Sequence, residues 1–161
     1  MQCAESRVRV RYAETDQMGV VYYANYLVWM EVARVEYCRQ IGFEYRDMEA
    51  DGAVLAVTEA KCQYRAPARF DDEVGIVTRM TEARSRTIRF AYEMRRVGDN
   101  QLLARGETLH AVCDRDGKRS ACLRSTGCFF PPEIRPGRSR PPQPYPALQS
   151  RRAIRTGDPL P

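Results

Sequence analysis

The residues that could carry out chemistry in this chain are few. Its single histidine is His110, and none of its serines lies in a G-x-S-x-G turn. A serine-hydrolase triad and a histidine-rich metal site are therefore excluded. The sequence also has neither a G-x-G-x-x-G segment nor a phosphate-binding loop. Any catalysis must come from carboxylates, backbone N–H groups and bound water.

Asp16 is the carboxylate whose surroundings best suit such a role. It lies three residues before Gly19, which can adopt the backbone angles of a tight turn, and the chain then enters an apolar stretch with helical spacing. No Ser, Thr or Asp immediately precedes the first helical turn, at residues 21–24, so its N–H groups are uncapped and could polarise a carbonyl. Asp16 would then act as general base or nucleophile. A surface aspartate in a polar turn also accounts for the pattern, and both interpretations stay open here.

The elements that would position this loop follow from the hydrophobic pattern. Residues 6–13 alternate, which predicts a half-exposed strand with Tyr12 on its apolar face. Residues 23–41 are apolar around most of a helical circumference, which predicts a helix packed deep in a sheet and ended by Gly42. A short turn of helix is expected at residues 45–50. Four further segments have the alternation of strands: residues 54–64, 74–82, 86–97 and 102–114.

This order of elements predicts an α+β fold in which one antiparallel sheet wraps around a single central helix. Such a sheet leaves an edge and an open face, so two domains are expected to pair. The segment from residue 122 onwards holds nine of the ten prolines and shows no sustained period. We therefore expect a folded domain over residues 1–121 and an irregular or disordered tail over residues 122–161.

Charge and cysteine usage narrow the class of protein. Residues 122–161 hold seven arginines against two acidic residues, so this segment accounts for the whole net charge of +5 and nucleic-acid binding is not expected. The six cysteines have wide, irregular spacing, which favours reduced core residues over disulfides or a zinc site. No stretch reaches the roughly 18 apolar residues of a membrane span, and no apolar signal region opens the chain. A cytoplasmic location is expected.

Two stretches resemble the 4-hydroxybenzoyl-CoA thioesterase-like family of hot-dog acyl-CoA thioesterases, and the similarity covers about residues 6–118. In the first stretch the matching positions are Tyr12, Glu14, Thr15, Asp16, Gly19, Val20, Val21, Tyr22, Asn25, Tyr26, Trp29, Glu31 and Arg34. In the second they are Tyr64, Ala66, Pro67, Ala68, Arg69, Asp71 and Asp72.

The resemblance implies a hot-dog fold, obligate homodimers often paired into homotetramers, an active site at the subunit interface, and neither metal nor cofactor. It implies that Asp16 is the catalytic carboxylate and that a backbone N–H near Tyr23 polarises the thioester carbonyl. Many relatives have histidine where this chain has Tyr23, so only the backbone role transfers. Residues expected to line the substrate site are Gly19, Val20, Val21, Tyr22, Asn25 and Tyr26.

Arginine and charge pairs supply the remaining candidates. Guanidinium groups match phosphate oxygens, so four arginines are candidates for the phosphates of coenzyme A, with solvated strand ends as the alternative. They are Arg65, Arg69, Arg84 and Arg86. Glu31 and Arg34, three residues apart on the helix, form either a weak surface pair or a partly buried pair that supports the active-site loop. His110 is expected to be structural.

The resulting hypothesis is hydrolysis of an acyl-CoA, or of an acyl-carrier-protein thioester, to a free acid and thiol. A hot-dog dehydratase is the rival within the fold, but such enzymes depend on a histidine and none lies near this loop. The rival from another class is a non-catalytic acyl-CoA-binding sensor or interaction module.

Overall fold

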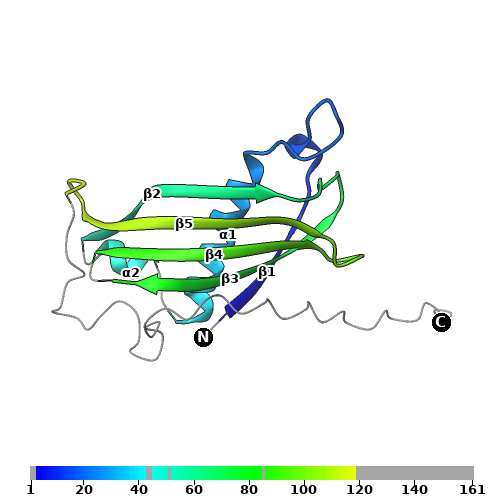
Figure 1. Cartoon of the computed structure of the whole chain (residues 1–161). Helices are drawn as coiled ribbons and strands as arrows, with labels where there is room; N and C mark the ends of the chain where they lie inside the picture. Colours follow the sequence, from blue (N-terminus) through cyan, green and yellow to red (C-terminus); the bar gives the residue numbers. More distant parts are fainter. Residues whose placement is uncertain (1–2, 43–44, 51, 85, 119–161) are drawn as a thin grey trace, which may run out of the picture.

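The computed structural model describes residues 3–42, 45–50, 52–84 and 86–118, which form one antiparallel sheet with a long helix across one face (Figure 1). The elements, in chain order, are β1 (Cys3–Arg9), the 3-10 turn η1 (Tyr12–Glu14), α1 (Asn25–Gln40), α2 (Tyr45–Ala50), β2 (Ala53–Tyr64), β3 (Glu73–Ala83), β4 (Thr87–Arg96) and β5 (Leu102–Asp114). The strand order is β1-β3-β4-β5-β2, and every neighbouring pair is antiparallel. The predicted α+β class and hot-dog fold are confirmed.

The four later strands agree with their predicted segments to within one residue at each end. On β4 the predicted alternation is correct, because Ile88, Phe90, Tyr92 and Met94 are all buried on the face that meets α1. Their neighbours on the other face are charged or small. The predicted boundary at residues 121 and 122, and the tail after it, lie outside the described residues.

Gly106 of β5 leaves room for a side chain of α1 in the core. A Cβ atom added to Gly106 would collide with the Sδ and Cε atoms of the Met30 side chain, which α1 inserts into the sheet. Met30 is fully buried, as are Ala33, Tyr37 and Cys38 on the same helical face. Glycine at this position therefore lets the Met30 side chain pack directly against β5.

The prediction that α1 is packed deep in the sheet on most sides is wrong. Its apolar residues Val28 and Val32 are each 48% exposed, and Leu27 is 39% exposed. A helix lying on one face of a sheet buries only the stripe that faces the strands, and helical spacing alone cannot say whether a second layer covers the rest. One chain therefore presents an apolar helical surface to its surroundings.

The first strand is also displaced from its prediction. β1 begins at Cys3 and ends at Arg9, whereas Tyr12 lies in η1 with 77% of its surface exposed. The cause is the carboxylate of Glu14, which accepts hydrogen bonds from the backbone N–H of Arg11 at 2.8 Å and from its guanidinium at 3.1 Å. These bonds close a turn where the alternating pattern alone predicts a continued strand.

His110 lies in the core, as expected for a structural residue, and its Nε2 is 2.9 Å from the hydroxyl of Thr108 and 3.4 Å from the Arg34 guanidinium. Burial, and then the positive charge of Arg34, lower the pKa of His110 to about 4. The folded protein thus holds this imidazole neutral.

This burial predicts a pH-dependent stability. Below pH 6.5 the unfolded chain binds a proton at His110 that the folded chain does not bind until about pH 4. The free energy of unfolding should therefore fall as the pH falls through this window, by about 3 kcal/mol in total. Denaturant titrations at pH 7.0, 6.0 and 5.0 measure it, and no other histidine contributes. His110→Gln should remove the pH dependence between 6.5 and 5; an unchanged slope in that variant would contradict the prediction.

Candidate active site

The loop between β1 and α1 holds Asp16 in a tight turn. The Gly19 N–H donates to the Asp16 carbonyl at 2.9 Å, and the Asp16 N–H donates to the Val20 carbonyl at 2.9 Å. Gly19 has a φ of +69°, a conformation that other residues rarely adopt. The Oδ1 atom of Asp16 accepts the Met18 N–H at 2.8 Å. The carboxylate is thereby oriented, and its Oδ2 atom has no hydrogen bond to any residue within the described ranges.

The same loop folds back onto the start of α1. Thr15 forms an antiparallel bridge with Val21, and the Tyr22 N–H donates to the Glu14 carbonyl at 2.9 Å. The side-chain amide of Asn25, the first residue of α1, donates to that carbonyl as well, at 2.9 Å. These bonds bring the segment that carries Asp16 together with the residues that begin the helix.

The start of α1 is not capped by a side chain, as predicted, but α1 begins at Asn25, so the predicted first turn at residues 21–24 lies just before the helix. The Asn25 N–H donates to the Tyr22 carbonyl at 3.0 Å, and the Leu27 N–H donates to the Ala24 carbonyl at 3.0 Å. The N–H groups of Tyr23 and Ala24, by contrast, donate to no other residue in the part of the chain that the structure describes. They carry partial positive charge at the helix start and can bind a carbonyl oxygen.

The buried side chain of Glu14 holds this loop in place. The residue is only 5% exposed, and its carboxylate accepts the Trp29 indole N–H at 3.1 Å in addition to the two bonds from Arg11. Burial by itself raises the pKa of Glu14, but the bonds from Arg11 and Trp29 together outweigh it and hold the pKa below its ordinary value. Glu14 is therefore a buried, ionised residue that ties η1 to Trp29 of α1.

The second family-like stretch, residues 64–72, is fastened to the same place. The Ala68 carbonyl accepts the Val21 N–H at 2.8 Å, and the Ala68 N–H donates to the Tyr26 hydroxyl at 3.1 Å. The Tyr64 hydroxyl donates to the Tyr23 carbonyl at 3.1 Å. Two stretches separated by some 40 residues in the chain thus form one site.

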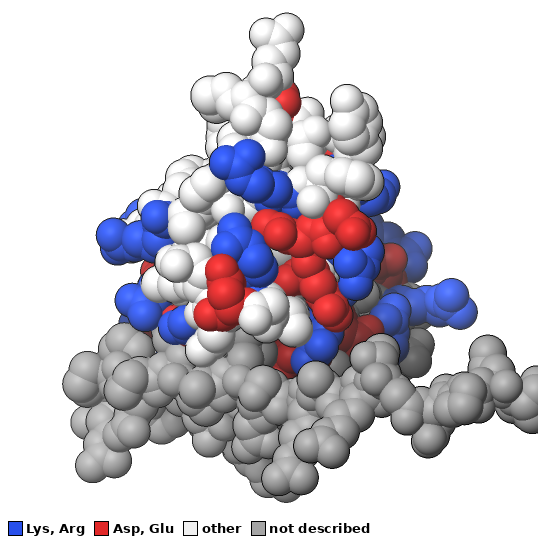
Figure 2. Space-filling view, turned by 90° about the vertical axis from the view of Figure 1, so that its right-hand side faces the viewer, with Lys and Arg blue, Asp and Glu red and all other residues white. Residues whose placement is uncertain are grey.

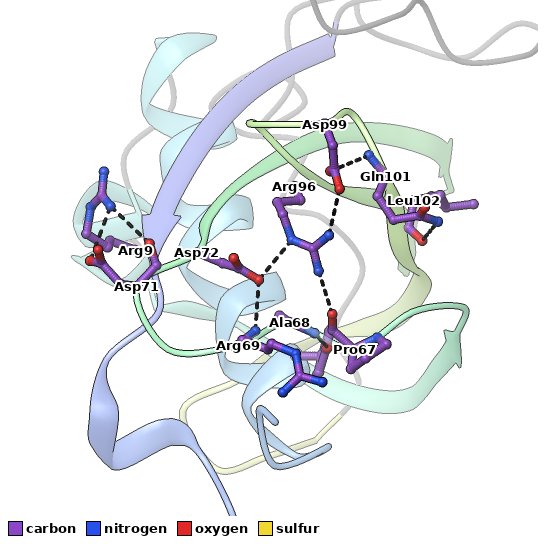
Figure 3. A network of polar contacts seen from close by, with 11 residues as sticks. Arg9, Pro67, Ala68, Arg69, Asp71, Asp72, Arg96, Asp99, Gln101 and Leu102 are labelled. Carbon is purple, nitrogen blue, oxygen red and sulfur yellow. Dashed lines mark hydrogen bonds and ion pairs between the residues drawn. The ribbon is translucent and has the colours of Figure 1, made fainter. Parts of the chain in front are cut away.

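Arg96 at the end of β4 holds the 64–72 stretch in its path (Figure 3). Its guanidinium donates to the Asp72 carboxylate at 2.9 Å, the Asp99 carboxylate at 2.8 Å and the Pro67 carbonyl at 2.8 Å. Asp72 also accepts the Arg69 N–H at 2.8 Å, so the loop is closed on itself. The hydrogen bond to Asp72, and then the hydrogen bond to Asp99, raise the pKa of Arg96, so its guanidinium stays charged.

The predicted loop residues divide into two groups. Val21 and Tyr26 are buried, and the Asn25 amide is engaged with Glu14, so these three side chains hold the loop in place. Gly19 and Tyr22 are exposed and Val20 is half-buried, so they can meet a substrate directly.

The end of the molecule with this loop has acidic and basic groups interspersed over its middle, whereas its projecting top is mostly uncharged (Figure 2).

The four candidate arginines do not form one cluster within one chain. Arg65 and Arg69 flank Ala68 beside the helix start, whereas Arg84 and Arg86 lie at the turn between β3 and β4, at the far end of the sheet. The 11 residues of β3 span about 35 Å, and the two pairs lie beyond opposite ends of this strand. All four are exposed, and Arg84 is paired with Glu82.

Glu31 and Arg34 lie away from the loop. Glu31 is exposed and borders an open groove of about 510 Å³ between residues 5–7 of β1 and residues 31–40 of α1. Arg34 points into the core toward His110. Within the described ranges no group of histidine, cysteine and acidic residues is arranged to hold a metal ion, and no helix there is long and apolar enough to cross a membrane.

Three supporting residues were missed by sequence reasoning. Glu14 and Trp29 belong to the family-like stretch, and that membership was the available signal, but the pattern did not say that they bond to each other. Arg96 had no signal, since its partners Asp72 and Pro67 are 24 and 29 residues away and only the sheet brings them near.

Known bacterial thioesterases are similar to this chain in sequence and in structure. The sequence profile of the Thioesterase-like superfamily matches residues 10–148. The acyl-CoA thioester hydrolase YbgC of Escherichia coli is 37% identical over 106 residues, 66% of this chain and 78% of that protein. A Bacillus subtilis relative is 44% identical over 78 residues, which are 48% of this chain and only 56% of the relative. The crystal structure of DHNA-CoA thioesterase from Staphylococcus aureus has a TM-score of 0.74 at 31% identity, covering 78% of this chain and 85% of that chain.

Proposed function

This chain belongs to the thioesterase-like superfamily, and from that premise we propose that it hydrolyses the thioester bond of an acyl-CoA. The observation that carries the proposal is the joining of Asp16 to the start of α1 in one hydrogen-bonded loop. The loop supplies an oriented carboxylate, and the helix start supplies the free N–H groups of Tyr23 and Ala24. Acyl transfer needs a base or nucleophile and hydrogen-bond donors for the carbonyl oxygen. In a chain with no suitable serine or histidine, the Asp16 carboxylate and these N–H groups can meet both needs.

In the proposed reaction the two N–H groups hold the thioester oxygen while it gains negative charge. Asp16, acting as base, takes a proton from the water that attacks the carbonyl carbon. Acting as nucleophile, it attacks that carbon itself, and water then hydrolyses the resulting anhydride. In both routes the C–S bond breaks, the coenzyme A thiolate takes up a proton, and the products are the free acid and the thiol.

We further propose that the working unit is a homodimer, paired into a homotetramer, with the site completed by a second subunit. The exposed apolar residues Val28 and Val32 of α1 support a second layer there, because an apolar helical face gains stability when it is covered. The helix start is also open, with Tyr23 60% exposed. A partner could bring its own Arg84 and Arg86 to the end of the molecule that holds Arg65 and Arg69.

The proposed ligand is an acyl-CoA, with an acyl-carrier-protein thioester as the alternative substrate. Arg65 and Arg69 support a phosphate-bearing leaving group, because both guanidinium groups are exposed beside the helix start. Neither metal nor cofactor is required by the proposed chemistry. We place the protein in the cytoplasm, where acyl-CoA thioesters are made and used.

The proposal is tested by release of free thiol, followed with a thiol reagent. The purified 161-residue chain is given short and long aliphatic acyl-CoAs, 4-hydroxybenzoyl-CoA and an acyl-carrier-protein thioester. We expect turnover of at least one acyl-CoA at roughly 1–10³ s⁻¹, the usual enzymatic range. Binding of these compounds without thiol release would instead identify a sensor and overturn the enzymatic proposal. The panel also defines which acyl group the site accepts.

A further inference from the structure

We propose that the Tyr64 hydroxyl is a positioning group for the proposed thioester hydrolysis: it fixes and polarises the peptide that carries the Ala24 N–H. This inference rests on the proposed function, because it assigns a role within the same carbonyl-binding site. Its starting point is the 3.1 Å hydrogen bond that Tyr64 donates to the Tyr23 carbonyl.

The Tyr23 carbonyl and the Ala24 N–H are the two ends of one peptide unit. A peptide is planar, and in its trans form the C=O and N–H bonds point in opposite directions; no cis peptide occurs among the described residues. Tyr64 therefore lies behind this unit, and the N–H points away from it. Donation to the carbonyl polarises the conjugated unit, which makes its N–H a stronger donor.

The neighbouring peptide has the same arrangement with a backbone donor. The Tyr22 carbonyl accepts the Asn25 N–H at 3.0 Å, and the other end of that peptide is the free N–H of Tyr23. Both free N–H groups thus belong to peptides whose carbonyls are engaged. Only the Ala24 unit depends on a side chain, so a single substitution can test its contribution.

The Tyr64 hydroxyl is equipped to stay a donor. Partial burial, and then the Cys62 thiol and nearby tyrosines, raise the pKa of Tyr64 to about 12, so the hydroxyl keeps its proton at neutral pH. Its ring packs edge-to-face on Tyr26 with ring centroids 5.2 Å apart. Tyr26 is itself held by the Ala68 N–H. The hydroxyl is therefore placed by the end of β2 and by α1 together.

The test is Tyr64→Phe, which keeps the ring and its contact with Tyr26 but removes the hydroxyl. Loss of one direct carbonyl donor costs about 10²- to 10³-fold in kcat, so loss of a group that only polarises such a donor should cost less, about 10-fold. Because the bond acts on the transition state, kcat and kcat/KM should fall by the same factor while KM stays within about twofold.

The matched control is Tyr37→Phe, which removes a hydroxyl from the far end of α1, where Tyr37 is buried and bonds to the Met80 backbone. It should keep kcat, and both variants should unfold within a few degrees of each other. The inference is overturned, and the proposed function stands, if wild type and Tyr37→Phe release thiol while Tyr64→Phe keeps the wild-type kcat. A change in KM alone in Tyr64→Phe has the same meaning. If wild type releases no thiol from any substrate, both are overturned.

Discussion

Asp16→Asn is expected to lower kcat for thioester hydrolysis by about 10²- to 10⁴-fold, the usual contribution of a positioned proton acceptor. The amide keeps an oxygen for the Met18 N–H and has the same shape, so the turn should persist. It cannot take a proton from water, and it is a poor nucleophile. Steady-state thiol release at saturating substrate measures the loss, and substrate affinity should change little.

Asp116→Asn serves as the control for this substitution. Asp116 is an exposed aspartate in the turn after β5, far along the chain from the loop, and its replacement also removes one negative charge. Its kcat should match wild type. Near-normal turnover of Asp16→Asn would show that Asp16 is not the catalytic base or nucleophile, even if the wild-type protein is a thioesterase.

Glu14→Ala is expected to lower the free energy of unfolding by about 2–4 kcal/mol. The substitution removes the acceptor of the Trp29 indole, which is itself buried, and of the Arg11 N–H. A buried donor without a partner retains the cost of leaving water. The loop with Asp16 should also lose its anchor, so kcat should fall together with stability. Denaturant unfolding followed by Trp29 fluorescence reports the change, since this is the only tryptophan.

Glu49→Ala is the surface control, because Glu49 is exposed at the end of α2, and its effect should stay within about 0.5 kcal/mol.

The pH dependence of stability gives a second check on Glu14. The pKa of Glu14 is lower in the folded protein than in the unfolded chain, so its ionisation stabilises the fold above the ordinary glutamate pKa. That contribution is lost as the pH falls through the folded value. Glu14→Gln should lack this part of the acid sensitivity; equal acid unfolding of both proteins would contradict it.

Hydrophobic spacing was sufficient to locate most elements. β5 begins and ends at the predicted residues, and α1 lies within the predicted range. These elements are long and have one buried side, so their pattern repeats several times. The prediction failed for β1, where the alternation continues to Tyr12 but the Glu14 carboxylate closes a turn. The two hydrogen bonds from Arg11 to this carboxylate outweighed the last period of the pattern.

The sequence by itself determined the chemistry that is available: one loop carboxylate, an uncapped helix start and two family-like stretches. These features depend only on which residues occur and on their order over short stretches, so they can be recognised without knowledge of the fold. Only the tertiary structure decided that Ala68 and Tyr64 meet the helix start, that Arg96 holds their loop, and that the arginines lie at opposite ends of β3. These depend on strand order and register, which bring together residues tens of positions apart and which no local period records.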